Sequence, residues 1–218
     1  MSWQPRTLGD FLAQAEPGAE ALVTPSARLT YAELLQKARE AAGAMQALGL
    51  GKGDHVAILM PNGEQWLSLF YGAALIGAVT VPVNTRFKAA EIDFCLKKSG
   101  AKALFHVDRF LNIDFGAMVR ETGFKVAVEI SALKKGKYTP VDVRPDDLLL
   151  IQFTSGTTAY PKGVMLTHDN MLRNAWAAGS RMGVRADDRY FNCRPFFHVG
   201  GSTMSALMSL VFGSCLVT

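Results

Sequence analysis

Short runs of consecutive apolar residues alternate along the chain with longer segments in which apolar residues recur every three or four positions. The runs lie at His55–Met60, Ala78–Val83, Ala101–Val107, Lys125–Ile130 and Leu148–Phe153. Because these runs are apolar at consecutive rather than alternate positions, we expect strands that are covered on both faces. Parallel sheets flanked by helices meet that requirement, so the pattern predicts an α/β fold.

The helical periodicity is clearest between Tyr31 and Leu48, where one face is apolar throughout. Thr30 and Glu33 have the spacing of a capping box, which predicts the start of this helix, and Gly49 predicts its end. Further helices are predicted at Glu64–Ile76, Ala89–Lys98 and Phe110–Glu121, and a polar connection at Ser131–Asp147.

Composition narrows the class of protein. The chain has 218 residues, of which 49% are hydrophobic, so it can bury a core and is expected to be globular. The formal net charge is only +4, and the basic residues are dispersed along the chain. No nucleic-acid partner is therefore expected.

The cysteines and the start of the chain bear on its compartment. Cys95, Cys193 and Cys215 are odd in number, lack CxxC spacing and lie in apolar or strand-like surroundings, which predicts reduced core residues. Residues 1–10 contain no apolar segment of signal-peptide length. These features favour a cytoplasmic enzyme.

One stretch, Gly200–Thr218, has no charged residue and is long enough to raise the question of a membrane span. Gly213 and Ser214 divide it into a part with helical spacing and a part typical of a strand. We therefore expect a buried helix followed by a strand, with no stable membrane insertion.

The chemistry is concentrated in Leu148–Asn170, which reads LLLIQFTSGTTAYPKGVMLTHDN. An apolar strand leads into a loop of small hydroxyl residues and glycine, then into Pro161, Lys162 and Gly163, and then into a predicted helix. Small residues let several backbone N–H groups approach an anion, hydroxyl groups add donors, and a lysine adds a full charge. The segment predicts a phosphate-binding loop, although it lacks the Gly-Lys-Ser/Thr ending of a Walker motif.

His168 and Asp169 follow this loop and could form an acid–base pair. The run from Thr167 to Asn170 has residues typical of a helix N-terminus. We favour this second interpretation.

The run from Thr154 to Val164 resembles TSGTTGxPKGV, the signature loop of the adenylate-forming superfamily. The resemblance implies that the β- and γ-phosphates of ATP are bound by Thr154, Ser155, Gly156, Thr157, Thr158 and Lys162. Ala159 departs from the pattern, because glycine is usual there and alanine disfavours a positive φ.

A second resemblance lies in Arg194–Gly201, which is similar to the aromatic-His-x-x-Gly segment of acyl-CoA synthetases. This resemblance implies that Phe197, His198 and Gly200 line the acyl pocket. The amino-acid-activating members of the superfamily more often carry an acid here, which pairs with the substrate ammonium. His198 therefore favours an acid without an α-amino group.

The resemblance to this family extends over nearly the whole chain and implies part of the large N-terminal domain of an acyl-CoA synthetase. Residues 1–145 would form a first α/β portion, and residues 146–218 the phosphate-loop strand and the start of the next portion. Such enzymes use ATP, Mg²⁺ and coenzyme A to convert a carboxylic acid into an acyl-adenylate and then a thioester. Their later segments bind adenine, ribose and Mg²⁺, and a small C-terminal domain supplies the catalytic lysine. We therefore expect an N-terminal fragment, inactive alone, that contains no catalytic residue and no metal ligand.

Two alternatives remain open. The chain could belong to an adenylating domain that serves a carrier protein or another acceptor, or it could be a non-catalytic nucleotide- or acyl-binding module. The carboxylic acid, the thiol acceptor and the oligomeric state are not readable from these residues.

Overall fold

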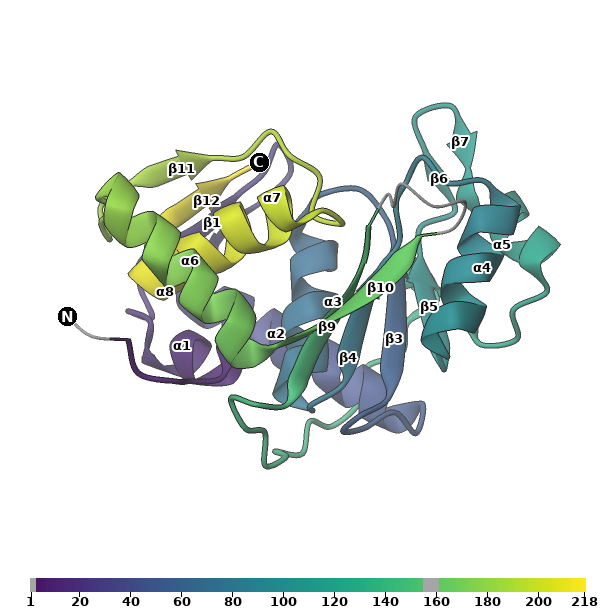
Figure 1. Cartoon of the computed structure of the whole chain (residues 1–218), viewed down its shortest axis with the longest axis horizontal. Helices are drawn as coiled ribbons and strands as arrows, with labels where there is room; N and C mark the ends of the chain where they lie inside the picture. The colour runs from purple at the N-terminus through teal and green to yellow at the C-terminus, as the bar shows by residue number, and fades with distance from the viewer. Residues whose placement is uncertain (1–2, 155–160) are drawn as a thin grey trace.

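The apolar runs of the sequence assemble into one six-stranded sheet in the computed structural model, which describes residues 3–154 and 161–218. In spatial order the strands are β10 (Lys162–Thr167), β9 (Leu148–Thr154), β4 (Val79–Pro82), β3 (His55–Leu59), β5 (Ala103–His106) and β8 (Ala127–Glu129). All neighbours pair in parallel except β10, which runs antiparallel to β9 (Figure 1). The predicted α/β fold is confirmed, with one antiparallel edge strand.

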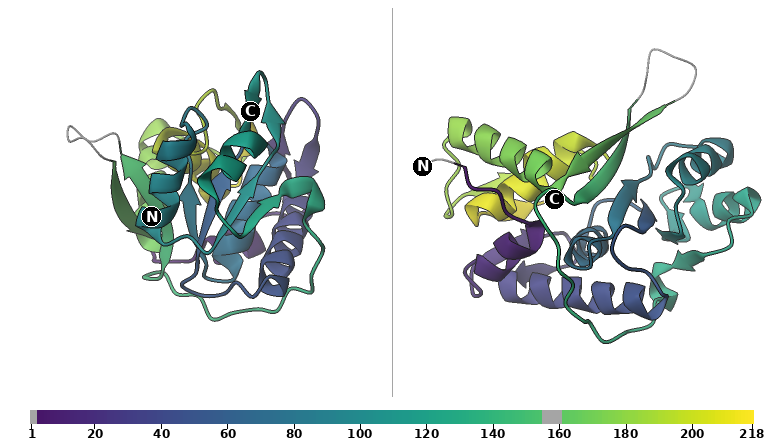
Figure 2. Two further views of the ribbon diagram at one scale, coloured as in Figure 1. Left: turned by 90° about the vertical axis from the view of Figure 1, so that its right-hand side faces the viewer. Right: turned by 60° about the horizontal axis from the view of Figure 1, so that its bottom comes forward.

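Helices cover both faces of this sheet, as the consecutive apolar residues of its strands require (Figure 2). The core on one face includes residues of α1 (Leu8–Gln14), α2 (Tyr31–Ala47), α3 (Glu64–Leu75) and α6 (His168–Met182). The other face packs against α4 (Ala89–Ser99) and α5 (Phe115–Thr122). Along β3, Val56 and Ile58 join the first core, whereas Ala57 and Leu59 join the second.

A second, four-stranded sheet joins the two ends of the described chain, and the sequence patterns did not predict it. Its order is β11 (Arg189–Phe191), β12 (Cys215–Val217), β1 (Glu20–Val23) and β2 (Arg28–Thr30). In this sheet β1 pairs in parallel with β12, so a strand near the start of the sequence lies beside one near residue 218.

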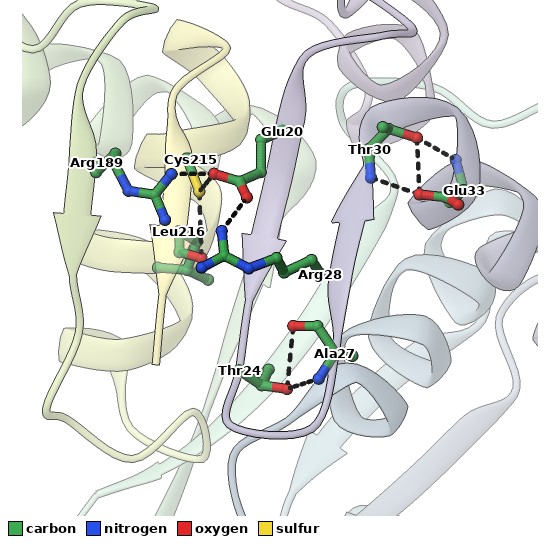
Figure 3. Close-up of polar contacts among 9 residues, drawn as sticks. All are labelled: Glu20, Thr24, Ala27, Arg28, Thr30, Glu33, Arg189, Cys215 and Leu216. Atoms are coloured by element: carbon green, nitrogen blue, oxygen red, sulfur yellow. Dashed lines mark hydrogen bonds and ion pairs between the residues drawn. The ribbon is translucent and has the colours of Figure 1, made fainter.

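One carboxylate ties the four strands of this second sheet together (Figure 3). Glu20 accepts a hydrogen bond from Arg28 at 2.8 Å, pairs with Arg189, and accepts the Cys215 thiol at 3.4 Å. Burial alone would raise the pKa of Glu20, but the hydrogen bonds from Arg28 and Cys215 and the charge of Arg189 hold it below its ordinary value. The carboxylate is thus kept ionised between its partners.

The longest helix, α2, begins and ends where its sequence predicts. The Thr30 hydroxyl accepts the Glu33 amide at 3.2 Å, and the Glu33 carboxylate accepts the Thr30 amide at 2.8 Å (Figure 3). Gly49 follows the last turn with a φ of 78°, a backbone conformation that favours glycine. The predicted capping box is therefore confirmed.

Two local predictions are wrong. The helix expected from Phe110 starts only at Phe115, because β6 (Arg109–Phe110) and β7 (Ile113–Asp114) form a short hairpin first. The Asp114 carboxylate then caps α5 by accepting the Ala117 amide at 2.7 Å. Cys193 is exposed rather than in the core, whereas Cys95 and Cys215 are buried free thiols as expected.

The uncharged stretch at residues 200–218 is a helix followed by a strand, as predicted. It comprises the end of α7 (Val199–Gly201), the π-helical turn η2 (Ser202–Leu207) and α8 (Met208–Phe212), and then β12. Gly213 separates the helical and extended parts with a φ of 70°. Over the part of the chain that is described, no helix has both the length and the hydropathy needed to cross a membrane.

The connection between β8 and β9 is a strap seated on α2. After a 3₁₀ turn, η1 (Ile130–Ala132), it continues without regular structure to Asp147. Gly43 and Gly136 meet backbone to backbone, and Gln46 exchanges two hydrogen bonds of 2.8 Å with the backbone of Thr139. The predicted division of the chain at residue 145 stays a prediction.

The close approach of the strap to α2 leads to a test of stability. A Cβ on Gly43 would meet the Gly136 carbonyl and stand 2.7 Å from the Tyr138 nitrogen. Gly43→Ala should therefore lower the free energy of unfolding of the 218-residue chain by about 1–3 kcal/mol, despite the better helix propensity of alanine. Urea unfolding followed by circular dichroism measures it. Gly18→Ala, where a Cβ meets nothing within 4 Å, is the matched control. Equal stability of the two variants would contradict the seating of the strap.

Candidate functional site

The predicted phosphate-binding loop is framed by a β-hairpin. Thr154, the last residue of β9, lies directly opposite Lys162, the first residue of β10, and its hydroxyl donates to the Lys162 carbonyl at 3.4 Å. Both residues are exposed. The helix predicted after this segment is present as α6, which begins at His168, but the strand β10 that returns along β9 before it was not predicted. Val164, Met165 and Leu166 extend this strand, and they pair with Gln152, Ile151 and Leu150 of β9.

Only part of the predicted phosphate-binding set can be placed. Thr154 and Lys162 stand at the open end of the hairpin. The other predicted residues, Ser155, Gly156, Thr157 and Thr158, lie outside the described residues, as does Ala159. The frame therefore contributes one hydroxyl group and one ammonium group at the two ends of the loop.

The second motif is held in place by the end of β3 and the start of α3. Phe196 is buried and packs against Trp66 with the ring centroids 5.3 Å apart. Asn62 accepts the Phe196 amide at 2.7 Å and donates to the Arg194 carbonyl at 2.8 Å. The backbone that leads to His198 is thereby anchored on both its polar and its apolar side.

His198 lies at the start of α7 and caps it. Its Nδ1 accepts the Gly200 amide at 3.1 Å, so a neutral ring carries its proton on Nε2. The side chain of His198 is exposed, Phe197 is half-buried and Gly200 is buried. Gly201 has no room for a side chain, because a Cβ there would meet the Pro195 backbone. The three residues predicted for the acyl pocket thus share one short turn.

Gln152 connects the two motifs and was missed by the sequence analysis. Its Nε2 donates to the Phe197 carbonyl at 3.0 Å and to the Phe153 carbonyl at 3.2 Å, and the residue is 8% exposed. The strand that leads into the phosphate loop therefore lies against the turn that carries His198. A signal was present, because Gln152 is an amide within the apolar run Leu148–Phe153.

The described residues do not supply a metal centre. Within residues 3–154 and 161–218, no group of three or more His, Cys, Asp or Glu side chains could hold a metal ion. The described side chains here offer an exposed hydroxyl group and an exposed ammonium group at the hairpin end, and an exposed imidazole at His198.

Comparison with known proteins finds the same family that the two motifs resemble. A family model described as AMP-binding enzyme matches residues 11–218. The long-chain-fatty-acid–CoA ligase FadD13 of Mycobacterium tuberculosis strain H37Rv is 37% identical, over 94% of this chain and 43% of its own length. The putative acyl-CoA synthetase YngI of Bacillus subtilis is 32% identical over 97% of this chain and 46% of its own length. The chain therefore spans about half the length of the curated relatives that it matches.

Solved structures match over almost the entire chain. The inhibitor-bound N-terminal domain of FACL13 from Mycobacterium tuberculosis superposes with a TM-score of 0.83 at 33% identity, covering 98% of this chain and 57% of that chain. The o-succinylbenzoate CoA synthetase MenE of Bacillus subtilis, in complex with the acyl-adenylate OSB-AMP, gives 0.86 at 25% identity, covering 98% and 55%. These matches confirm that the fold is that of an N-terminal domain of acyl-CoA synthetase type.

His168, the other candidate for acid–base chemistry, has a structural role. It is fully buried, and its Nδ1 accepts the Leu8 amide at 3.1 Å, which ties α1 to α6. Thr167 and Asn170 form the capping box of α6, so the interpretation as a helix N-terminus is confirmed. Burial lowers the pKa of His168 from 6.5 to about 4, although the nearby Asp147 carboxylate opposes the shift.

This depressed pKa predicts a pH-dependent stability. His168→Asn keeps an acceptor for the Leu8 amide but removes the titrating ring. The unfolded imidazole binds a proton near pH 6.5 and the folded one only near pH 4, so its contribution is complete above pH 6.5 and is lost as the pH falls to about 4. Relative to the variant, the wild-type chain should lose on the order of 3 kcal/mol across this window. Urea unfolding at a series of pH values measures the difference, and a difference independent of pH would contradict the assignment.

Proposed function

Because this chain belongs to the family of AMP-binding enzymes, we propose that the whole protein activates a carboxylic acid with ATP and passes the acyl group to coenzyme A. In the first step an oxygen of the acid attacks the α-phosphorus of ATP and pyrophosphate leaves. In the second step the thiol attacks the acyl carbon and AMP leaves. The chain contributes the phosphate-binding and acyl-binding part of the site.

The pairing of Thr154 with Lys162 is the observation that carries this proposal. The antiparallel register returns the chain to its starting point, so both ends of the signature loop stand together at one end of the hairpin. A hydroxyl donor and an ammonium that converge there can bind the β- and γ-phosphates and stabilise charge on the leaving pyrophosphate. Ser155, Gly156, Thr157 and Thr158 are proposed to complete this set.

The turn that carries His198 is proposed to receive the acid. Phe197 offers an aromatic surface, and the exposed Nε2 of His198 offers a hydrogen-bond donor, with Gly200 fixing the ring orientation. A histidine does not pair with an ammonium as a carboxylate would, which favours an acid without an α-amino group. The names of the relatives are consistent with such an acid, since they include a long-chain-fatty-acid–CoA ligase and a feruloyl-CoA synthase.

Mg²⁺ would accompany ATP, but we assign it no ligand because the described residues contain no suitable cluster. Coenzyme A as the acceptor is supported by relatives that are named as CoA ligases. We also propose a cytoplasmic location, which rests on the sequence alone.

The direct experiment is carboxylate-dependent exchange of labelled pyrophosphate into ATP. It uses the full-length protein that contains this chain, with a panel of fatty and aryl acids, with and without coenzyme A. Exchange with one of these acids, and an acyl-CoA product when the thiol is added, is the expected result. Acyl-adenylate that accumulates without consumption of coenzyme A would point to another acceptor, and an absence of exchange with every acid would favour a binding module.

Lys162→Ala tests the assignment of the loop. Loss of the ammonium removes a charge that would stabilise the leaving pyrophosphate, so kcat of the exchange should fall roughly 100- to 1000-fold. The KM for the acid should change much less, because Lys162 is assigned to the phosphates and not to the acid.

Lys134→Ala is the matched control for this substitution. Lys134 is an exposed lysine on the strap, far along the chain from the hairpin, and its replacement removes the same charge. Its exchange kinetics should equal those of the wild type. Wild-type kinetics in Lys162→Ala as well would rule out the phosphate-binding role.

A further inference from the structure

We propose that Gln152 is a positioning residue that sets the placement of the phosphate loop relative to the acyl-binding turn. The inference rests on the proposed function, since it assigns how two parts of that site are aligned. Gln152 is not expected to touch substrate. It acts through the backbone of Phe197, the residue before His198.

The contacts of Gln152 are those of a bridge. Its amide is 8% exposed, and its Nε2 is shared between the Phe197 carbonyl and the Phe153 carbonyl of its own strand. Its Oε1 has no hydrogen-bond partner among the residues that the structure describes. An amide buried in this way costs free energy that an aliphatic residue at the same place would not. The hydrogen bond from Gln152 to the Phe197 carbonyl offsets part of that cost.

Both structures that the bridge joins are also held by other contacts. On one side, β9 pairs with β4 and β10, which sets the register of Gln152 in the sheet. On the other side, Asn62 and Trp66 hold the backbone around Phe196. Among the hydrogen bonds of the described residues, the one from Gln152 to Phe197 is the bond that joins β9 to this turn.

Such a bridge matters for the first chemical step. Gln152 precedes Thr154 by two positions and bonds the residue before His198, so it links the neighbours of the proposed phosphate and acid groups. The reacting carboxylate oxygen and the α-phosphorus must be held in line within a few tenths of an ångström. Loss of the bridge should therefore lower kcat for adenylation more than it weakens the binding of ATP or the acid.

Gln152→Met tests this inference in the full-length protein, because methionine has nearly the same length but cannot donate. Steady-state pyrophosphate exchange, with ATP and the acid varied in turn, should show kcat lowered roughly 10- to 100-fold, since misplacement by about 1 Å can cost that much. Both KM values should stay within about threefold of the wild type, because no substrate contact is removed. Gln36→Met, the same change at an exposed position of α2, should leave all three parameters unchanged.

Gln152→Glu is a second variant of nearly the same size. Its carboxylate would place an acceptor against the Phe197 carbonyl, so kcat should fall at least as far as in Gln152→Met. Asn62→Ala loosens the same turn without touching β9, and its kcat should fall less than that of either Gln152 variant. Thermal unfolding of each variant checks that the protein is folded.

The outcomes separate the inference from the proposed function. A selective fall in kcat in both Gln152 variants supports the bridge. Wild-type kcat in Gln152→Met, or an equal fall in Asn62→Ala, overturns it while the proposed function stands. An absence of exchange in the wild-type protein with every acid overturns the proposed function and the bridge together.

Discussion

Burial of the central sheet from both faces is the constraint on which the rest of the structure depends. Strands buried in this way must pair all their backbone groups, and parallel neighbours need helical crossovers between them. The crossovers α3 and α4 lie on opposite faces, so β3 has β4 on one side and β5 on the other. On its other side β4 pairs with β9, whose last residue, Thr154, stands opposite Lys162.

The second sheet joins segments that lie far apart in the sequence. Parallel pairing of β1 with β12 places residues near the start of the sequence beside those near residue 218, and Glu20 binds groups from three other strands. Because η2 and α8 pack against α6 and lead into β12, which pairs with β1, the turn around His198 is linked to elements from both ends of the chain. The turn that we propose to bind the acyl group thus depends on the assembled domain as well as on its local motif.

Buried polar groups in this domain fall into two classes. His168 is buried to join α1 to α6, and the depressed pKa that follows is a consequence of packing rather than a sign of catalysis. Gln152 is buried between the two motifs that the proposed reaction needs. A polar residue within an apolar run therefore has to be judged by what it bonds, which the composition of the run does not reveal.

The sequence by itself determined five strands of the central sheet, the main helices and the two motifs, because periodicity, capping residues and ordered signatures are local properties. The helix at Tyr31, with its Thr30 and Glu33 cap, needed no tertiary information. Only the tertiary structure decided that β10 returns along β9, that a hairpin precedes α5, and that Cys193 is exposed. Those outcomes depend on which distant strand or helix covers a given residue. For the same reason Gln152 could not be assigned from the sequence, since its partner Phe197 lies 45 positions away.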